Sequence, residues 1–219
     1  MRRWQWVAWA AASALTAPLA VAATPRPYFP GDVPVTLFIQ SLAAGAAWAE
    51  AVTKTAQPPA GYVLLGITAI ASWLMGGWRG ALMSLISFAG MWLAGYWLNP
   101  RIARPRPPAS LVYVSRPLSG YSFPSIFALT YASSVGYLAM LALRTLRGRV
   151  RLAVVSACCL LLLAGGSARV ALGAHWPSDV LTSYLIGFCW AALLVSFLPR
   201  PGPAAIPNER SGASQSRGK

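Results

Sequence analysis

The sequence has few charged residues, and very few of them are acidic. Among 219 residues there are four Asp and Glu, one His and 18 Lys and Arg, so that charged residues make up 10% of the chain. An ordinary soluble domain carries about 25% charged residues. Since 57% of the residues are hydrophobic, the composition argues against a soluble domain and favours a membrane protein.

Cysteine is also scarce, and its positions carry no functional signal. Cys158, Cys159 and Cys189 all lie inside apolar stretches. Cysteines in such surroundings behave as small buried hydrophobic residues. They therefore give no information about the redox compartment.

Six apolar runs are long enough to cross a hydrocarbon core, which takes about 20 residues of helix. They are residues 4–23, 60–77, 80–98, 125–143, 152–168 and 180–198, and none contains a charged residue. Charge at mid-membrane costs about 2.5 to 3.5 kcal/mol, so this sorting of charge into loops predicts an all-α, polytopic membrane protein with six transmembrane helices. The net charge of +14 is spread between these runs, which argues against a nucleic-acid partner.

The first run has a competing interpretation. Arg2 and Arg3 precede it, and it ends in Ala20-Val21-Ala22, which resembles a signal-peptidase site. Either a first transmembrane helix or a cleaved signal peptide leaves residue 24 outside the cytoplasm. We expect residues 1–24 to form this segment, residues 25–199 the membrane domain, and residues 200–219 a disordered cytoplasmic tail rich in Pro, Gly and Ser.

A seventh apolar stretch, residues 35–52, contains Gln40, Ser41 and Glu50. If it spanned the membrane, the basic segment 144–151 would lie outside, against the positive-inside rule. We therefore predict an interfacial helix on the outer surface. Both termini are then expected in the cytoplasm, and the protein in a bacterial-type inner membrane. The cytoplasmic side then holds most of the basic residues, namely Arg2, Arg3, Arg79, Arg144, Arg147, Arg149, Arg151, Arg200, Arg210, Arg217 and Lys219.

The basic residues left outside are concentrated in two short loops. The first, residues 99–108, combines Arg101, Arg104 and Arg106 with four prolines. Guanidinium groups bind phosphate oxygens in a bidentate fashion, and a proline-stiffened backbone reduces the entropy lost on binding. The alternative for this loop is a membrane anchor, in which each arginine contributes about 1 kcal/mol by its attraction to anionic lipid.

The second loop contains the single histidine of the chain. His175 lies six residues after Arg169 and four before Asp179. Such a carboxylate can accept the Nδ1 proton of the imidazole and leave Nε2 free as a nucleophile. A purely structural histidine stays open as an alternative, as does a role for Asp179 limited to capping the last helix.

These residues resemble the signature of the type-2 phosphatidic acid phosphatase family of membrane lipid phosphatases, whose fold is shared with vanadium haloperoxidases. The family pattern is Lys, six residues, Arg-Pro; then Pro-Ser-Gly-His; then Ser-Arg, five residues, His, three residues, Asp. Arg169, His175 and Asp179 match the third part with the correct spacing, Arg106-Pro107 matches the end of the first, and Pro124-Ser125 begins the second. The resemblance extends over about residues 35–198.

The resemblance implies six transmembrane helices, a site that faces the periplasm, no metal or other cofactor, and a phosphohistidine intermediate on His175. Arg106 and Arg169 would hold the phosphoryl oxygens. Ser125 would add a hydroxyl and a backbone donor where a helix begins, which is a natural anion site. The implied partner is a membrane lipid phosphate or diphosphate within the bilayer.

Two positions depart from the family pattern. Asn99 stands at the family's lysine, and Ile126-Phe127 stand at its Gly-His. Asn99 can still donate a hydrogen bond, and Arg101 or Arg104 can supply the missing charge. Phe127 cannot protonate a leaving group, a contribution worth about 100- to 10,000-fold in rate.

Three functions therefore stay open. The first is an active phosphatase or phosphotransferase that acts on a membrane lipid at the extracytoplasmic face, with lipid diphosphates such as prenyl diphosphates as the favoured substrates. The second is a catalytically inactive relative that binds a lipid phosphate or a partner protein. The third is a transporter with coincidental motifs, which the absence of charge from the apolar runs disfavours. The sequence does not identify the lipid or the oligomeric state.

Overall fold

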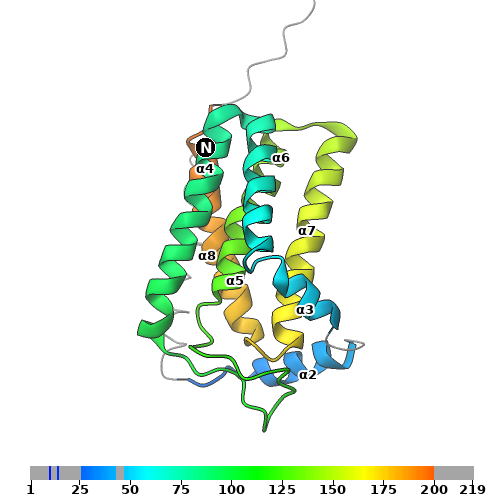
Figure 1. Ribbon diagram of the computed structural model, residues 1–219, viewed down its shortest axis with the longest axis vertical. Coiled ribbons are helices and arrows are strands. Elements are labelled where there is room, and N and C mark those ends of the chain that lie inside the picture. Colours follow the sequence, from blue (N-terminus) through cyan, green and yellow to red (C-terminus); the bar gives the residue numbers. More distant parts are fainter. Residues whose placement is uncertain (1–9, 11–13, 15–25, 43–46, 200–219) are drawn as a thin grey trace, which may run out of the picture.

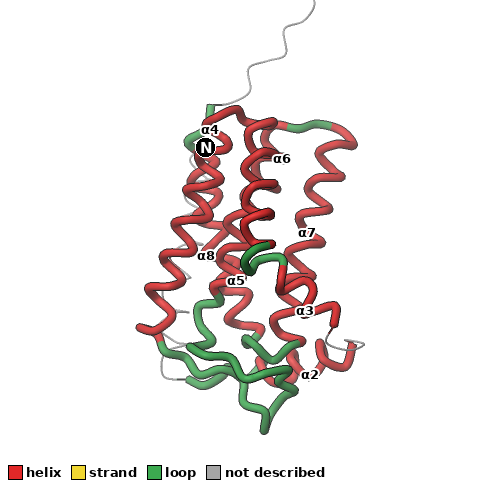
Figure 2. Tube along the Cα trace, viewed as in Figure 1, coloured by secondary structure: helices red, strands yellow, loops and turns green. Residues whose placement is uncertain are grey.

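The computed structural model describes residues 10, 14, 26–42 and 47–199. These residues form helices joined by loops, with no strand among them, so the expected all-α class is confirmed for this part of the chain (Figure 2). The elements are α2 (Asp32–Leu42), α3 (Ala47–Lys54), α4 (Ala60–Ile102), α5 (Ile126–Tyr131), the π-helical turn η1 (Ala132–Gly136), α6 (Tyr137–Thr145), α7 (Gly148–Ala171) and α8 (Pro177–Ser196).

Helix α4 is a hairpin of two antiparallel arms. Gly77 interrupts it with φ 64° and ψ −164°, a conformation that glycine adopts without strain. A Cβ added to Gly80 would lie 2.5 Å from the carbonyl oxygen of Ser72, whereas residues eight apart in a straight helix are separated by about 12 Å. The chain turns over at one end of the bundle and runs back beside itself (Figure 1). The two arms correspond to the runs expected at residues 60–77 and 80–98.

The segment α5–η1–α6 forms the centre of the bundle. Its side chains Leu129, Tyr131, Val135, Tyr137 and Leu141 are all essentially inaccessible. The chain approaches its neighbours closely here, because α8 packs against the π-helical turn and α4 packs against α5 and α6. This central segment carries the apolar run expected from residue 125 onward.

Four helical segments are long and apolar enough to cross a membrane. They are α4, residues 126–145 (α5 to α6), α7 and α8. Because α4 consists of two arms, these segments contain five of the six expected runs. The first expected run and the expected disordered tail lie outside the described residues, apart from residues 10 and 14.

The prediction of one continuous helix over residues 35–52 is wrong, whereas its location at the outer interface stays a prediction. Two short helices, α2 and α3, lie there and are inclined to each other by 107°. Helix α2 lies across the end of the bundle that carries the long loops, and α3 packs along α7 (Figure 1). Taken as one bent unit, the pair would be apolar enough to count as a further span.

The two ends of the bundle differ in the loops they carry. One end holds α2, the loop of residues 103–125 and the short loop before α8 (Figure 1). The other end holds the turn of α4 and the connection from α6 to α7. The arginine loops expected from the sequence to form one site therefore meet at one end.

Candidate active site

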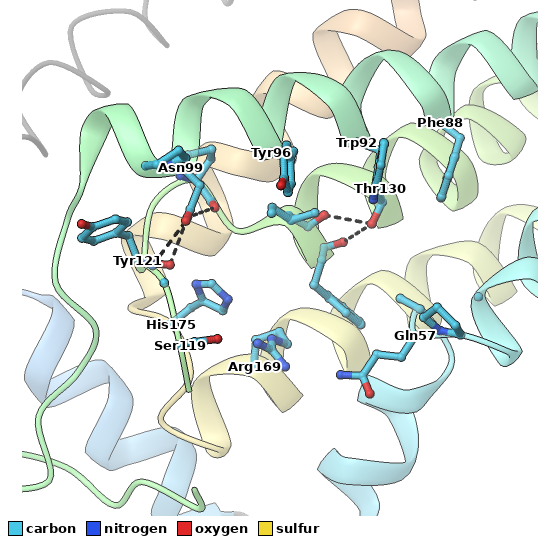
Figure 3. A pocket seen from close by; sticks show the side chains of 18 of the residues that line it. Gln57, Phe88, Trp92, Tyr96, Asn99, Ser119, Tyr121, Thr130, Arg169 and His175 are labelled. Carbon is cyan, nitrogen blue, oxygen red and sulfur yellow. Dashed lines mark hydrogen bonds between the residues drawn. The ribbon is translucent and has the colours of Figure 1, made fainter. Parts of the chain in front are cut away.

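A pocket of about 890 Å³ opens at the loop end of the bundle. The polar residues at its loop end come from three separate parts of the chain and are Asn99, Arg106, Ser119, Arg169 and His175. Gln57 and Thr130 add polar groups further along the pocket (Figure 3). The same pocket continues along an aromatic wall on the second arm of α4, where Phe88, Trp92 and Tyr96 follow one another at helical spacing. A charged end joined to an apolar channel is suited to an amphiphile that carries an anionic head group.

The position of His175 follows from how α7 ends. The carbonyl oxygen of Arg169 accepts hydrogen bonds from the backbone N–H groups of Ala174 and His175, at 3.0 and 3.3 Å. Gly173, with φ 63°, allows the chain to fold back over the end of the helix. The imidazole is thereby brought beside the guanidinium group of Arg169, although the two residues are six positions apart in sequence.

The ring of His175 is held in one orientation. Its Nδ1 lies 2.6 Å from the carbonyl oxygen of Ser122, and because a carbonyl can only accept, the proton of the neutral ring resides on Nδ1. Nε2 then carries a lone pair and lies 3.4 Å from Nη1 of Arg106. Burial is the main cause that lowers the pKa of His175 well below its usual range, and the positive charges of Arg169 and Arg106 lower this pKa further. The ring is therefore neutral at pH 7 and can act as a nucleophile.

Arg106 lines the pocket and is held in place by hydrogen bonds to backbone carbonyl groups. Its Nη1 donates to Ala174 at 2.6 Å, while Nε and Nη2 donate to Ser119 at 3.3 and 3.1 Å. Burial lowers the pKa of Arg106, an effect that the charge of Asp179 opposes. A guanidinium group has five N–H donors, so this arrangement orients the fork and leaves donors for a phosphoryl oxygen.

Arg169 reaches the pocket from the last turn of α7. It is 8% exposed, and its guanidinium carbon lies 5.5 Å from the centre of the Phe127 ring. Its Nε has no hydrogen-bond partner among the described residues. A buried guanidinium group without a full set of partners carries a desolvation cost that an anionic ligand would relieve.

The structure corrects the expected contact between Asp179 and His175. The carboxylate of Asp179 accepts hydrogen bonds from Arg104, from the hydroxyl of Ser122 and from the backbone N–H of Trp176, at the first turn of α8. Because these donors occupy the carboxylate, the carbonyl oxygen of Ser122 takes the place that we expected Asp179 to fill at Nδ1. Asp179 also takes part in a helix cap, but that is not its whole role.

Three other expected phosphate-binding residues, Arg101, Arg104 and Ser125, lie outside the pocket lining. Arg104 is fully buried and pairs with Asp32 and Asp179. Arg101 stacks on the ring of Trp97, 3.7 Å from its centre, and is exposed. Neither arginine therefore replaces the charge of the family's lysine in this structure.

Ser125 begins α5, as expected, but its polar groups are engaged within the protein. Its hydroxyl accepts from the backbone N–H of Ala128 at 3.3 Å, and its own N–H donates to Ser183 at 2.9 Å. It is completely buried. Ser125 thus caps a helix and does not face the pocket.

Sequence reasoning missed Ser122 and Asp32. Ser122 binds His175 through its backbone, which no side-chain pattern reveals. Asp32 is one of only four acidic residues in the chain, and that rarity was the one available signal. Its carboxylate lies 2.9 Å from Arg104, a residue 72 positions away.

Both departures from the family pattern are at the pocket. The amide of Asn99 donates to the carbonyl groups of Tyr121, Phe123 and Pro124, between 3.0 and 3.3 Å, so it ties the loop to α4. Phe127 stacks on Tyr131, with ring centres 4.5 Å apart, and lines the pocket beside Arg169. The described part of the chain holds no second histidine at this position or elsewhere.

Comparison with known proteins shows which proteins the chain resembles. Residues 81–202, more than half of the chain, match the PAP2 superfamily. The match begins in the second arm of α4 and includes every residue of the pocket's charged end.

Two relatives illustrate the similarity. Phosphatidylglycerophosphatase B of Haemophilus influenzae is 33% identical over 97 residues, which cover 42% of this chain but only 39% of that protein. The crystal structure of a transmembrane PAP2-type phosphatidylglycerolphosphate phosphatase from Bacillus subtilis superposes with a TM-score of 0.71 at 21% identity, covering 86% of this chain and 94% of the other. At that level of identity the superposition shows a shared fold.

Proposed function

Because the chain belongs to the PAP2 superfamily, we propose that it is a membrane lipid phosphatase that works through a phosphohistidine intermediate on His175. The observation that carries this proposal is the orientation of the imidazole. Its Nδ1 is bound to the Ser122 carbonyl, so Nε2 is unprotonated and lies 3.4 Å from Arg106, in the lining of a large pocket. A lone pair beside two guanidinium groups is the arrangement that attack on a phosphoryl group requires.

The proposed reaction has two steps. The lone pair of Nε2 forms a bond to phosphorus, and the bond from phosphorus to the leaving oxygen breaks, with its electron pair going to that oxygen. A water molecule then attacks the phosphohistidine, phosphate is released, and the electron pair returns to Nε2. Arg106 and Arg169 neutralise the charge that develops on the phosphoryl oxygens.

The identity of residue 127 restricts the leaving group. An alkoxide released from a phosphate monoester has a conjugate acid about as weak as water, so it needs a proton donor. A phosphate released from a diphosphate has a second pKa of about 6 and can leave as an anion. Phe127 has no proton to give, so we propose that the substrate is a lipid diphosphate, such as a prenyl diphosphate. The aromatic wall of Phe88, Trp92 and Tyr96 would receive the apolar chain.

A catalytically inactive lipid-phosphate-binding protein is the second candidate function. The observation that favours it is the engagement of Asn99, whose amide nitrogen donates to three backbone carbonyl groups instead of carrying a charge towards the pocket. Binding would then use Arg106 and Arg169 without turnover. The two relatives are named as phosphatases of phosphatidylglycerol phosphate. This phosphate monoester is a third possible ligand or substrate, and the same assay tests it.

The proposed orientation in the membrane includes six spans, with the site on the extracytoplasmic face and both termini in the cytoplasm. The positive-inside rule supports it, because Arg79 and the basic connection at residues 144–151 lie at the end of the bundle opposite the pocket.

Phosphate release by the purified protein in detergent tests the proposed function. We expect hydrolysis of a prenyl diphosphate, but not of phosphatidate or phosphatidylglycerol phosphate. His175→Ala should abolish this activity, and Lys54→Ala should leave it unchanged, because Lys54 is exposed and lies outside the pocket lining.

Restoring the family histidine separates the alternatives. Phe127→His places an imidazole beside Arg169 and should add monoester cleavage, alone or with Ile126→Gly. Hydrolysis of a monoester by the unaltered protein would contradict the diphosphate restriction. If folded protein binds vanadate but neither it nor the restored variant releases phosphate from any lipid, the inactive binding protein is the correct reading.

A further inference from the structure

Arg104 is a completely buried charged side chain near the site, and it lies outside the pocket lining. We propose that Arg104, together with Asp32 and Asp179, is a positioning group that holds the Ser122 segment and through it keeps His175 in the tautomer with a free Nε2. The consequence for catalysis rests on the function proposed above, whereas the effect on the imidazole does not.

The first evidence is the set of partners of Arg104. Its Nη2 lies 2.9 Å from Asp32, and its Nη1 binds Asp179 and, at 3.0 Å, the hydroxyl of Ser178. Its exposure is 0%, and the ring of Phe29 covers it with a centre 4.8 Å from the guanidinium carbon. The guanidinium group therefore joins the start of α2 to the start of α8, and it does not line the pocket.

The second evidence is the way in which this cluster holds Ser122. The backbone N–H of Ser122 donates to the carbonyl oxygen of Arg104 at 2.7 Å, and its hydroxyl donates to Asp179. The remaining polar group, the Ser122 carbonyl, accepts from His175 Nδ1 at 2.6 Å. Two of the three polar groups of Ser122 are thus fixed by the cluster, and the third sets the tautomer of the nucleophile.

Energetics favour a positioning role for this cluster over a stabilising one. Burying a guanidinium group with two carboxylates carries a desolvation penalty that their attraction offsets only with close geometry. Apolar replacements of such networks are often as stable or more stable. What apolar residues cannot supply is the hydrogen bond that anchors the Ser122 hydroxyl.

The single histidine makes the imidazole directly observable. Protein labelled with ¹⁵N-histidine and purified through a tag without histidine gives ring nitrogen signals from His175 alone. In the unaltered protein at neutral pH we expect a protonated Nδ1 and an unprotonated Nε2. Ser122→Ala and Asp179→Asn remove the side-chain bond that anchors Ser122 and leave only its backbone N–H bond to Arg104. The carbonyl is then held less firmly, and we expect a mixture of both tautomers.

Arg104→Gln should have the same effect, but it leaves two buried carboxylates without a cation and can fail to fold. The two milder variants keep the test decisive in that case. Arg79→Gln, at the exposed far end of the bundle, is the control with the same change of charge and should leave the spectrum unaltered. Thermal unfolding in detergent shows which variants are folded.

Kinetics on a lipid diphosphate complete the experiment. Loosening of the nucleophile should lower kcat about 100-fold, with KM changed less than about twofold because Arg106 and Arg169 still bind the phosphate. If folded Ser122→Ala and Asp179→Asn keep a pure Nδ1–H tautomer, the positioning role is overturned. If the tautomer responds as expected but the unaltered protein hydrolyses no lipid, the positioning role stands and the proposed function fails.

Discussion

At the scale of single residues, the site separates two kinds of arginine. Arg106 and Arg169 line the pocket, whereas Arg104 is buried in ion pairs and Arg101 stacks on Trp97. All carry the same charge in the sequence, but their surroundings give them different roles. Only the pair in the pocket is placed to bind an anion near His175.

This distinction leads to a prediction about anion binding. Arg106→Ala and Arg169→Ala should each weaken binding of vanadate by about 1.5 to 3 kcal/mol, the range for hydrogen bonds to charged groups, which corresponds to about a 10- to 150-fold rise in Kd. Lys54→Ala should leave Kd unchanged. Titration of the purified variants in detergent measures all three, and equal losses at the three positions would indicate diffuse surface charge instead of a site.

At the scale of elements, the hairpin of α4 determines where the aromatic wall lies. The arms approach so closely at Gly80 that a methyl group there would overlap the Ser72 carbonyl. The hydroxyl of Tyr137 also donates to the carbonyl of Gly80 at 3.0 Å, which joins the hairpin to the central helix. The turn of the α4 hairpin is far from the pocket, but it orients the second arm, which carries Phe88, Trp92 and Asn99.

The hairpin predicts a contrast between two glycines of the same helix. Gly80→Ala should destabilise the protein by about 1 to 3 kcal/mol, the usual cost of overpacking. Gly66→Ala is the matched control, because a Cβ there meets nothing within 4 Å, and it should be neutral or stabilise by up to about 1 kcal/mol. Thermal unfolding in detergent measures both. Equal stability of the two variants would contradict the close approach of the arms.

At the scale of the whole molecule, positive charge collects at both ends of the bundle with different surroundings. At the pocket end, buried and half-buried arginines are engaged with carbonyl groups, carboxylates and aromatic rings. At the other end, three exposed arginines lie where α6 connects to α7: Arg147 precedes α7, and Arg149 and Arg151 lie in its first turn. Exposed arginine in a short loop is the kind that the positive-inside rule counts.

The proposed orientation predicts which loops are reachable from outside. In a variant with Cys158, Cys159 and Cys189 replaced by Ala, Ser110→Cys should react with a membrane-impermeant thiol reagent added to intact spheroplasts. Arg149→Cys should react only after lysis, although both positions are exposed. Labelling of position 149 from outside would overturn the orientation, while the site itself would be unaffected.

The sequence by itself determined the class of protein and the candidate nucleophile, His175, whose role stays a proposal. Charge-free apolar runs predict helices because backbone polar groups in a membrane must be satisfied within the segment, and five of the six runs lie in the described helical segments. The spacing of Arg169 and His175 predicted their meeting, since one helix end and a short loop join them. These features are local, so a linear pattern contains them.

Only the tertiary structure decided which polar groups meet across long stretches of chain. Arg104 pairs with Asp32 and Asp179, which lie 72 and 75 positions away, and so is withdrawn from the pocket. Ser122 replaces Asp179 at Nδ1 of His175 through a backbone carbonyl, a group that every residue possesses and no pattern distinguishes. Such contacts depend on how α2, α8 and the loop of residues 103–125 pack together. Packing is a property of the folded chain that residue spacing does not contain.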